Sequence, residues 1–271
     1  MQSLMRTESQ QDLQQEGHYR ASILAIGTEV TSGEILNKNA TWLARELEAL
    51  GVEVNLHLAI PDDPLLMKEG LEFASSHSQI LFLVGGLGPT QDDLTREVVA
   101  RWLSVPLEFS EQVFLELKAK LEARAVALRT NHRRQCEFPL GAESLVNSVG
   151  TARGFFARSG KLAGGLFALP GPPRELEPMW EQQVVPKLQA LDIQPPYQLD
   201  IWCCEGVPES EVAELCEELL KEELNHPQPA RLGYRASLPK VYVKLWWPRQ
   251  RQGEISSVKT KLSQALAPWL K

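Results

Sequence analysis

Short, uninterrupted apolar runs are the feature that most constrains the fold of this chain. "SILAI" at residues 22–26 and "QILFLV" at residues 79–84 are each followed directly by glycine. Runs of this length without polar alternation predict strands that are buried on both faces. Segments with helical spacing of apolar residues, such as 36–50, lie between the strands. The alternation predicts an α/β domain with a mostly parallel sheet covered by helices.

A proline pair marks the end of this domain. Pro195 and Pro196 lie in "DIQPPYQ" and cannot continue a helix. Beyond them the pattern predicts a strand, an acidic helix, an alternating strand "KVYVKLWW" and a final helix, which together indicate a small α+β domain. We therefore predict an α/β domain over 21–194 and an α+β domain over 197–271. Residues 1–20 are polar and Gln-rich, and we expect a disordered tail there.

Composition narrows the possible partners. The 271 residues carry a net charge of −7, whereas nucleic-acid-binding proteins usually present a basic face, so we expect no nucleic-acid partner. No apolar run reaches the length of a membrane span, and no signal peptide is recognisable, so we expect a cytoplasmic protein without membrane contact. The four cysteines form no Cys-x-x-Cys pair, which argues against a zinc or thioredoxin-like site.

The loop after the second apolar run, "GGLGPTQDD", has the composition of an anion site. Gly85, Gly86 and Gly88 allow successive backbone amides to converge on one point, and such a nest before a helix binds phosphate oxygens. Thr90 adds a hydroxyl. A phosphate-bearing small molecule, such as a nucleotide, is therefore the expected ligand.

Two adjacent carboxylates, Asp92 and Asp93, end the same loop and would repel a phosphate. A divalent cation resolves the conflict, because it takes hard oxygen ligands and bridges carboxylate to phosphate. Capping of the following helix is the alternative role for the aspartates. The loop after the first strand adds Glu29, Gly33, Asn37 and Asn39. Its carboxylate and two amides suit ribose hydroxyls, a purine or pterin edge, or a metal, and a capped helix start is the alternative.

The two loops together resemble the N-terminal nucleotide-binding domain of the competence-damage-inducible CinA family. The segments that carry the resemblance are "AIGTEVTSGEILNKNATWLARELEALG", "VGGLGPTQDDLTREVVA", "NHRRQCEFPLGAESLVNSVGTARGF" and "ALPGPPRELEPMW", and the resemblance extends over about residues 21–271. It implies the three-layer α/β/α fold of the molybdopterin-binding MoaB/MogA-like proteins. It also implies, as in some members, metal-dependent hydrolysis of ADP-ribose to AMP and ribose 5-phosphate.

The resemblance also assigns residues by position. Metal and catalytic roles fall to Glu29, Asp92 and Asp93, with Mg, Mn or Co as the divalent metal ion. The substrate-binding positions are Gly33, Asn39, Gly85, Gly86, Gly88, Thr90, Asn147, Gly150, Thr151 and Gly171, and the motifs also include Thr95, Gln135, Pro170 and Glu175.

Two features of this chain depart from the family pattern. Arg153 replaces the proline of "GTAPGF", and this extra cation would either bind a ligand phosphate or point to solvent. Longer family members carry a C-terminal domain that deamidates nicotinamide mononucleotide, and because the chain ends after the α+β domain we expect no such activity from it.

Three functions remain open from the sequence. The first is a metal-dependent nucleotide pyrophosphatase acting on ADP-ribose or a related dinucleotide. The second is a binding module for molybdopterin or an adenylylated compound, and the third is a catalytically idle scaffold. We also expect a homodimer, because Trp246 and Trp247 fall on opposite faces of one strand and one of them needs a cover.

Overall fold

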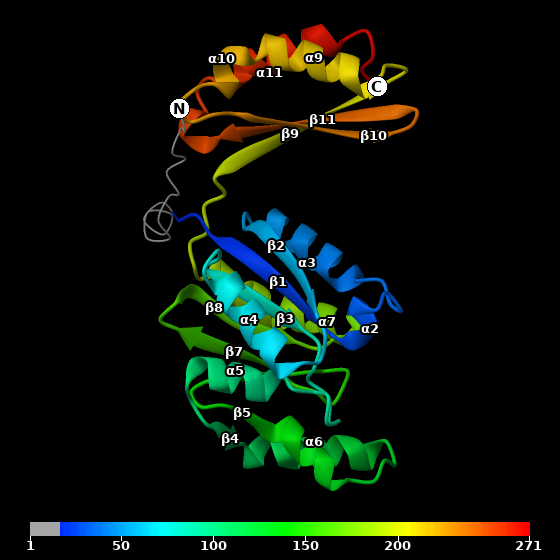
Figure 1. Ribbon diagram of the computed structural model, residues 1–271, viewed down its shortest axis with the longest axis vertical. Helices are drawn as coiled ribbons and strands as arrows, with labels where there is room; N and C mark the ends of the chain where they lie inside the picture. The colour runs from blue at the N-terminus through cyan, green and yellow to red at the C-terminus, as the bar shows by residue number, and fades with distance from the viewer. Residues whose placement is uncertain (1–16) are drawn as a thin grey trace. The chain divides into compact units, whose positions relative to one another are not determined.

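The computed structural model describes residues 17–271, which divide into two compact units between Gln194 and Pro195 (Figure 1). The expected tail lies outside the described residues as far as residue 16. The carbonyl of Gly17 accepts a hydrogen bond from the amide of Gln194 at 2.9 Å, and the first strand begins at Arg20. The folded part of the first unit therefore begins before residue 21.

A six-stranded sheet forms the centre of the first unit, with strand order β2-β1-β3-β8-β7-β6. The first four strands in this order run parallel, and β7 runs antiparallel to both of its neighbours, β8 and β6. The strands are β1 (Arg20–Ile26), β2 (Glu53–Ile60), β3 (Ile80–Val84), β6 (Glu143–Leu145), β7 (Gly154–Ser159) and β8 (Leu162–Leu169). A separate antiparallel pair consists of β4 (Leu107–Phe109) and β5 (Glu137–Pro139).

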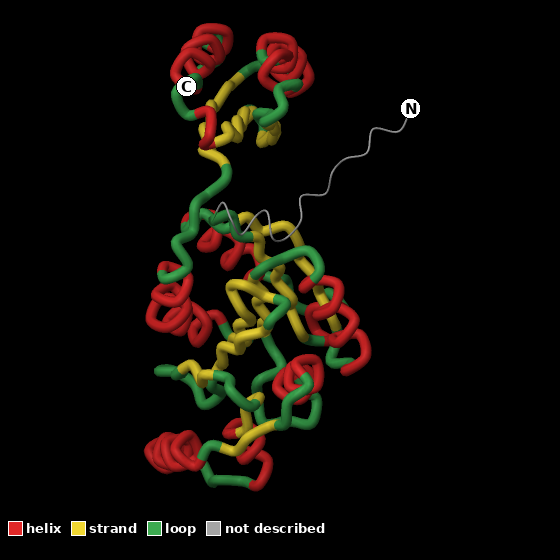
Figure 2. Tube along the Cα trace, turned by 90° about the vertical axis from the view of Figure 1, so that its left-hand side faces the viewer, coloured by secondary structure: helices red, strands yellow, loops and turns green. Residues whose placement is uncertain are grey.

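Helices cover both faces of this sheet, which gives three layers (Figures 1 and 2). The mostly parallel α/β/α architecture predicted from the sequence is therefore confirmed. The helices of one face pack with Leu24, Leu81 and Leu83, and they are α4 (Pro64–Ser75), α5 (Thr95–Leu103) and α6 (Glu111–Ala123). The opposite face packs with Ile23, Ile80 and Phe82, and its helical segments are α3 (Lys38–Ala49), α7 (Pro173–Met179), the π-helical η2 (Trp180–Val184) and α8 (Val185–Gln189).

Local sequence signals explain several element boundaries. Asp63 accepts hydrogen bonds from the amides of Leu65 and Leu66, both at 2.9 Å, and so caps α4, with Pro64 in its first turn. Gly51, with φ of 83°, ends α3 in the conformation that glycine favours. A hairpin turn around residues 159–160 joins β7 and β8, which pair antiparallel. The short elements α2 (Thr28–Thr31) and η1 (Thr130–Cys136) were not predicted.

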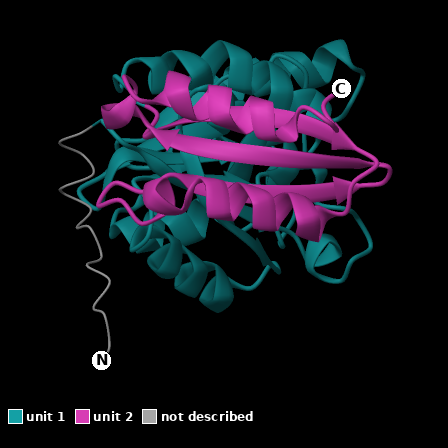
Figure 3. Cartoon of the chain, turned by 90° about the horizontal axis from the view of Figure 1, so that it is seen from above, with its two compact units in different colours: residues 1–194 teal, residues 195–271 magenta. Residues whose placement is uncertain are grey.

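The second unit is a three-stranded antiparallel sheet with helices on one face (Figure 3). Its strand order is β10-β11-β9, with β9 (Tyr197–Glu205), β10 (Arg231–Ser237) and β11 (Lys240–Pro248). The helical segments are α9 (Glu209–Leu219), α10 (Lys221–Leu224), η3 (Arg249–Arg251) and α11 (Ile255–Leu266). The smaller α+β domain expected after the proline pair is thus present.

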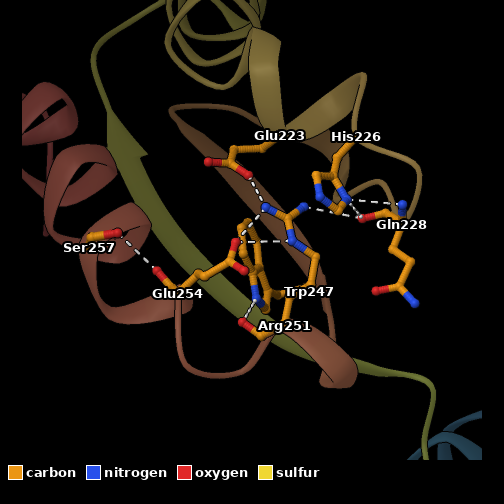
Figure 4. Close-up of polar contacts among 7 residues, drawn as sticks. All are labelled: Glu223, His226, Gln228, Trp247, Arg251, Glu254 and Ser257. Carbon is orange, nitrogen blue, oxygen red and sulfur yellow. Dashed lines mark hydrogen bonds and ion pairs between the residues drawn. The ribbon is translucent and has the colours of Figure 1, made fainter.

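A buried arginine links the end of β11 to the helical layer through ion pairs and hydrogen bonds (Figure 4). The guanidinium of Arg251 lies 4.6 Å from the ring centroid of Trp247, forms ion pairs with Glu223 and Glu254, and donates to the carbonyl of Gln228 at 3.1 Å. Trp247 returns a hydrogen bond from Nε1 to the carbonyl of Arg251 at 2.8 Å. The network joins residues from α10, β11 and the turn before α11.

Trp246 and Trp247 do lie on opposite faces of β11. Trp247 is fully buried in the core of the second unit, and Trp246 is partly buried. A Cβ atom at Gly233, on the neighbouring strand, would come within 2.8 Å of the Trp246 ring. One side of the Trp246 ring therefore packs over a glycine of its own sheet, and the homodimer stays a prediction. No helix among residues 17–271 has the length and apolarity needed to span a membrane.

Candidate functional site

A pocket of about 870 Å³ opens at the carboxyl ends of the parallel strands of the first unit. Residues that directly follow β1, β3 and β8, namely Gly27, Gly85 and Pro170, contribute to its lining, as expected for an open α/β sheet. Of the residues predicted from the sequence, those that line the pocket are Glu29, Asn39, Gly85, Gly86, Gly88, Asp92, Asp93, Thr151 and Gly171. Those that do not line it are Gly33, Thr90, Asn147 and Gly150.

The glycine loop presents free backbone donors at this pocket. Gly85 and Gly86 have φ values of 112° and 65°, which side-chain-bearing residues rarely adopt. Within residues 17–271, the amides of Gly86 and Leu87 donate to no protein acceptor. Both residues line the pocket. Two neighbouring donors without an acceptor form an arrangement that suits an anionic oxygen.

Asp93 builds the loop rather than capping the helix. Its Oδ1 accepts from the amide of Gly88 at 2.7 Å, while Oδ2 accepts from the amide of Thr90 at 2.8 Å and from the Thr90 hydroxyl. Helix α5 begins at Thr95 with Leu94 at the N-cap and no side-chain cap. The alternative that the aspartates cap this helix is therefore wrong.

Asp92 is the exposed member of the aspartate pair. Its side chain is exposed and lines the pocket. Hydrogen bonding with Thr90 and with its own backbone, aided by the charge of Arg134, lowers the pKa of Asp92 below its ordinary value. This carboxylate is consequently ionised at neutral pH and available to a ligand.

Three arginine side chains form contacts around the pocket but do not line it. Arg96, fully enclosed, donates to the carbonyl of Leu87 at 3.0 Å and to that of Arg153 at 3.1 Å, and burial lowers its pKa to about 10. Arg134 donates to the carbonyl of Thr90 at 2.6 Å. The Arg153 side chain is nearly buried and forms an ion pair with Glu116 on α6. The two roles expected for Arg153 from the sequence, binding a ligand phosphate and pointing to solvent, are therefore both wrong.

Residues of the segments 25–51 and 168–180, which carry the family resemblance, also line the pocket. Asn37 caps α3 by accepting from the amide of Ala40 at 3.1 Å, and Asn39 donates to the carbonyl of Gly171 at 2.5 Å. Asn39 therefore fixes the loop before α7 through a direct contact. Asp62, at the end of β2, accepts from the amide and hydroxyl of Thr28 at 2.8 and 2.9 Å. Asp62 was not among the site residues selected from the sequence, although its place shortly after a parallel strand was the available signal.

Residues of the segment "NHRRQCEFPLGAESLVNSVGTARGF" hold a pocket residue in place through hydrogen bonds. Asn147 is buried, donates to Glu175 Oε2 at 2.7 Å, and accepts from the amide of Gly150 at 2.6 Å. Asn147 and Gly150 thus position Glu175, which lines the pocket. Gln135 also lines the pocket and is buried, and its Oε1 has no hydrogen-bond partner within the described residues.

The charge of the lining is strongly acidic. One basic residue, Lys38, faces six carboxylate residues, which are Glu29, Glu34, Asp62, Asp92, Asp93 and Glu175. Within residues 17–271, no three His, Cys, Asp or Glu side chains converge into a set that could hold a metal ion. A cation in this pocket would therefore need oxygen atoms from its ligand or from water to complete its coordination.

Comparison with known proteins identifies the class to which this fold and pocket belong. The family model of a probable molybdopterin binding domain matches residues 22–190, which contain the whole pocket. The chain therefore belongs to the probable molybdopterin binding domain family.

Individual relatives place it close to CinA-like proteins, which confirms the resemblance seen in the sequence. It is 37% identical over 206 residues to a CinA-like protein of Dictyoglomus thermophilum, covering 76% of this chain and 49% of the relative. It is 35% identical over 207 residues to a putative competence-damage inducible protein of Clostridium botulinum, covering 76% and 50%. The chain thus spans about half the length of these curated relatives.

A solved structure supports the same placement. The protein CinA of unknown function from Thermoplasma acidophilum matches with a TM-score of 0.57 and 26% sequence identity. The match covers 63% of this chain and 99% of that chain.

Proposed function

We propose that the pocket of the first unit binds a nucleotide together with a divalent cation and hydrolyses its phosphoanhydride bond. The observation that supports this is that one cavity holds both anion-binding and cation-binding groups. These are two free backbone amides of the glycine loop and six carboxylate residues. Free amides favour a phosphate, and the carboxylates disfavour it unless a cation lies between them.

The residues present fit a cation that arrives with its nucleotide. Mg²⁺ usually takes one or two carboxylates and completes its octahedral shell with phosphate oxygens and water. Asp92, with its exposed and ionised carboxylate, and Glu29, in the first turn after β1, are the two residues we assign to hold it. The cation, when bound, would polarise the phosphoanhydride and offset the charge that develops during cleavage.

The remaining residues bind and orient. In this proposal the amides of Gly86 and Leu87 donate to one phosphate, while Asp93 holds the loop in shape. Water attacks one phosphorus, a new P–O bond forms, and the bridging P–O bond breaks, with Glu29 accepting the proton that the water loses. For ADP-ribose as substrate, the products are AMP and ribose 5-phosphate.

A hydrolysis panel tests the proposal. The full chain is incubated with ADP-ribose and related dinucleotides in Mg²⁺, Mn²⁺ or Co²⁺, and again with a chelator, and the products are resolved by chromatography. We expect AMP to form only with metal, and Asp92→Asn to lower the rate by about a hundredfold. Equal rates with and without chelator, or no turnover of any dinucleotide, would reject the hydrolase assignment.

The family description gives a second candidate, a pterin-binding module in the same pocket. Gln135 favours it because its buried amide oxygen, which has no hydrogen-bond partner within the described residues, would accept a hydrogen bond from the polar edge of a fused heterocycle. Fluorescence of the purified chain distinguishes the two, because a retained pterin emits and a dinucleotide does not.

A further inference from the structure

The sheet of the second unit has one face without helices, and that face has an unusual composition. Along β11, Val241, Val243, Leu245 and Trp247 are buried in the core beneath α9 and α11. Strand alternation places the other residues of β11 on the opposite face. We call this the open face, and its residues on β11 are Lys240, Tyr242, Lys244 and Trp246.

Pairing between strands extends the open face sideways. Tyr242 lies between Arg235 and Cys203, and Trp246 lies between Arg231 and Leu199. The open face therefore carries two aromatic rings on its central strand, with four basic residues, which are Arg231, Arg235, Lys240 and Lys244. One acidic residue of the described strands, Glu205, shares this face, and it pairs with Lys271 at 3.4 Å.

The opposite charge lies on the helical side. Residues 195–271 contain ten acidic and ten basic residues, so the second unit has no net charge. The exposed carboxylates gather on α9 and α10, at Glu209, Glu211, Glu214, Glu217, Glu218 and Glu222. The second unit thus has two acidic helices, α9 and α10, and a basic open face, while α11 adds Lys259 and Lys261 on the helical side. The net charge of −7 for the whole chain hides this division.

Cations and rings alternate on the open face. The Arg235 guanidinium lies 4.5 Å from the ring centroid of Tyr242, and Lys244 Nζ lies 5.7 Å from that of Trp246. Within the described residues, Arg235, Lys240 and Lys244 have no ion-pair partner. Both rings are partly exposed. Basic residues interleaved with accessible rings are what a chain of phosphates and bases requires.

We propose that the open face binds single-stranded nucleic acid. Bases stack on Tyr242 and Trp246, while Arg235, Lys240 and Lys244 contact the phosphates. An acidic peptide would satisfy the charges but would leave the rings unused, and duplex DNA would offer phosphates without accessible base faces. The proposal is independent of the nucleotide pocket in the first unit.

The test measures fluorescence anisotropy of labelled twelve-nucleotide oligo-dT and oligo-U with the full chain at 50 mM salt. EDTA is present, so that metal-dependent nucleotide binding in the first unit does not contribute. We expect binding that weakens with salt, with a slope of about −2 in log K against log salt, because three phosphates are neutralised on a single strand. Asp92→Asn should leave this binding unchanged.

Variants locate the surface. Trp246→Leu and Tyr242→Leu should each weaken binding by about tenfold, since stacking on an aromatic ring is sequence-tolerant but needs the ring. Lys244→Ala should weaken binding and lower the salt slope by about 0.7. Lys221→Ala, which removes an exposed cation from α10 on the helical side, is the matched control and should change neither. Circular dichroism checks that each variant is folded.

Three results would overturn the proposal. The first is absence of binding at 50 mM salt. The second is that polyglutamate displaces the labelled oligonucleotide as effectively as unlabelled oligo-dT does when the two competitors are compared at equal concentration of negative charge. That result would indicate a surface that binds any anion. The third is full affinity in folded Trp246→Leu and Tyr242→Leu chains, which would show that bases do not stack there.

Discussion

Asp93 Oδ1 accepts a hydrogen bond from the backbone amide of Gly88 at 2.7 Å, and this contact closes the glycine loop onto its own last residue. The neighbouring Asp92 is exposed, and its hydrogen bonding is limited to Thr90 and its own backbone. Two adjacent residues of the same type thus have different tasks, since one shapes the loop and the other faces the pocket.

This difference predicts that the two aspartates contribute unequally to the free energy of unfolding. Asp93→Asn places an amide NH₂ where Asp93 now accepts from two backbone amides and a hydroxyl, so we expect the free energy of unfolding to fall by about 1–3 kcal/mol. Asp92→Asn should leave it unchanged. Urea unfolding of both variants and the parent chain measures this, and equal destabilisation by the two substitutions would contradict the assignment.

Two glycines of the pocket provide a second contrast. A Cβ atom at Gly86 would overlap Thr95 Oγ1, and its φ of 65° strains other residues, so Gly86→Ala should destabilise the fold by about 1–3 kcal/mol. At Gly171 a Cβ would meet only Gly85 Cα, at 3.8 Å. Gly171→Ala should therefore keep the melting temperature and narrow the pocket, weakening nucleotide binding severalfold. Gly160→Ala, in the hairpin turn, is the control, and a melting temperature lowered by Gly171→Ala would count against this geometry.

The arginine network of the second unit should matter for stability. Arg251→Met leaves Glu223 and the carbonyl of Gln228 without their partner in a nearly buried position, so we expect a loss of about 3 kcal/mol. Glu254→Gln, at a more exposed carboxylate, should lose at most about 1 kcal/mol. Thermal unfolding followed by tryptophan fluorescence compares them, and a loss below 1 kcal/mol for Arg251→Met would show that the network is dispensable.

Cysteine reactivity should follow burial. Burial raises the pKa of Cys136 and Cys216 to about 11 each, and raises that of Cys204 as well. Because the thiolate is the reactive form and appears only as the pH rises through the pKa, these three thiols should resist iodoacetamide at pH 8 in the native chain. Cys203, partly exposed, should react first. Mass spectrometry of modified peptides checks this, and native labelling of Cys136 at the rate of Cys203 would refute it.

The three α/β/α layers could be predicted because strands buried on both faces appear in the sequence as uninterrupted apolar runs. "SILAI" and "QILFLV" became β1 and β3 at the centre of the sheet, and Pro195–Pro196 coincides with the division between the units. Strand β10 was missed because "RLGYRAS" alternates weakly and Gly233 interrupts it. The glycine there makes room for the Trp246 ring, a tertiary relationship that no local pattern contains.

Most residues of the pocket could be predicted from the sequence, but their roles could not. Glycines and carboxylates at strand ends identified the pocket, because parallel strands bring their carboxyl ends to one edge. The separate tasks of Asp92 and Asp93 depend on which carboxylate turns back to Gly88 and Thr90 within the loop. The support from Arg96 depends on contacts across nine residues or more, as between Arg96 and Leu87. The basic face of the second unit was hidden for a similar reason, since net charge carries no information about which side of a sheet each charge occupies.

The central claim is that a nucleotide and a divalent cation bind the first unit together. Isothermal titration of ADP-ribose into the full chain, in Mg²⁺ and again in EDTA, tests it most directly. The account predicts measurable binding in Mg²⁺, at least tenfold weaker binding in EDTA, and loss of the difference in Asp92→Asn, because linkage makes each ligand raise the affinity of the other equally. The same affinity in Mg²⁺ and in EDTA would contradict it.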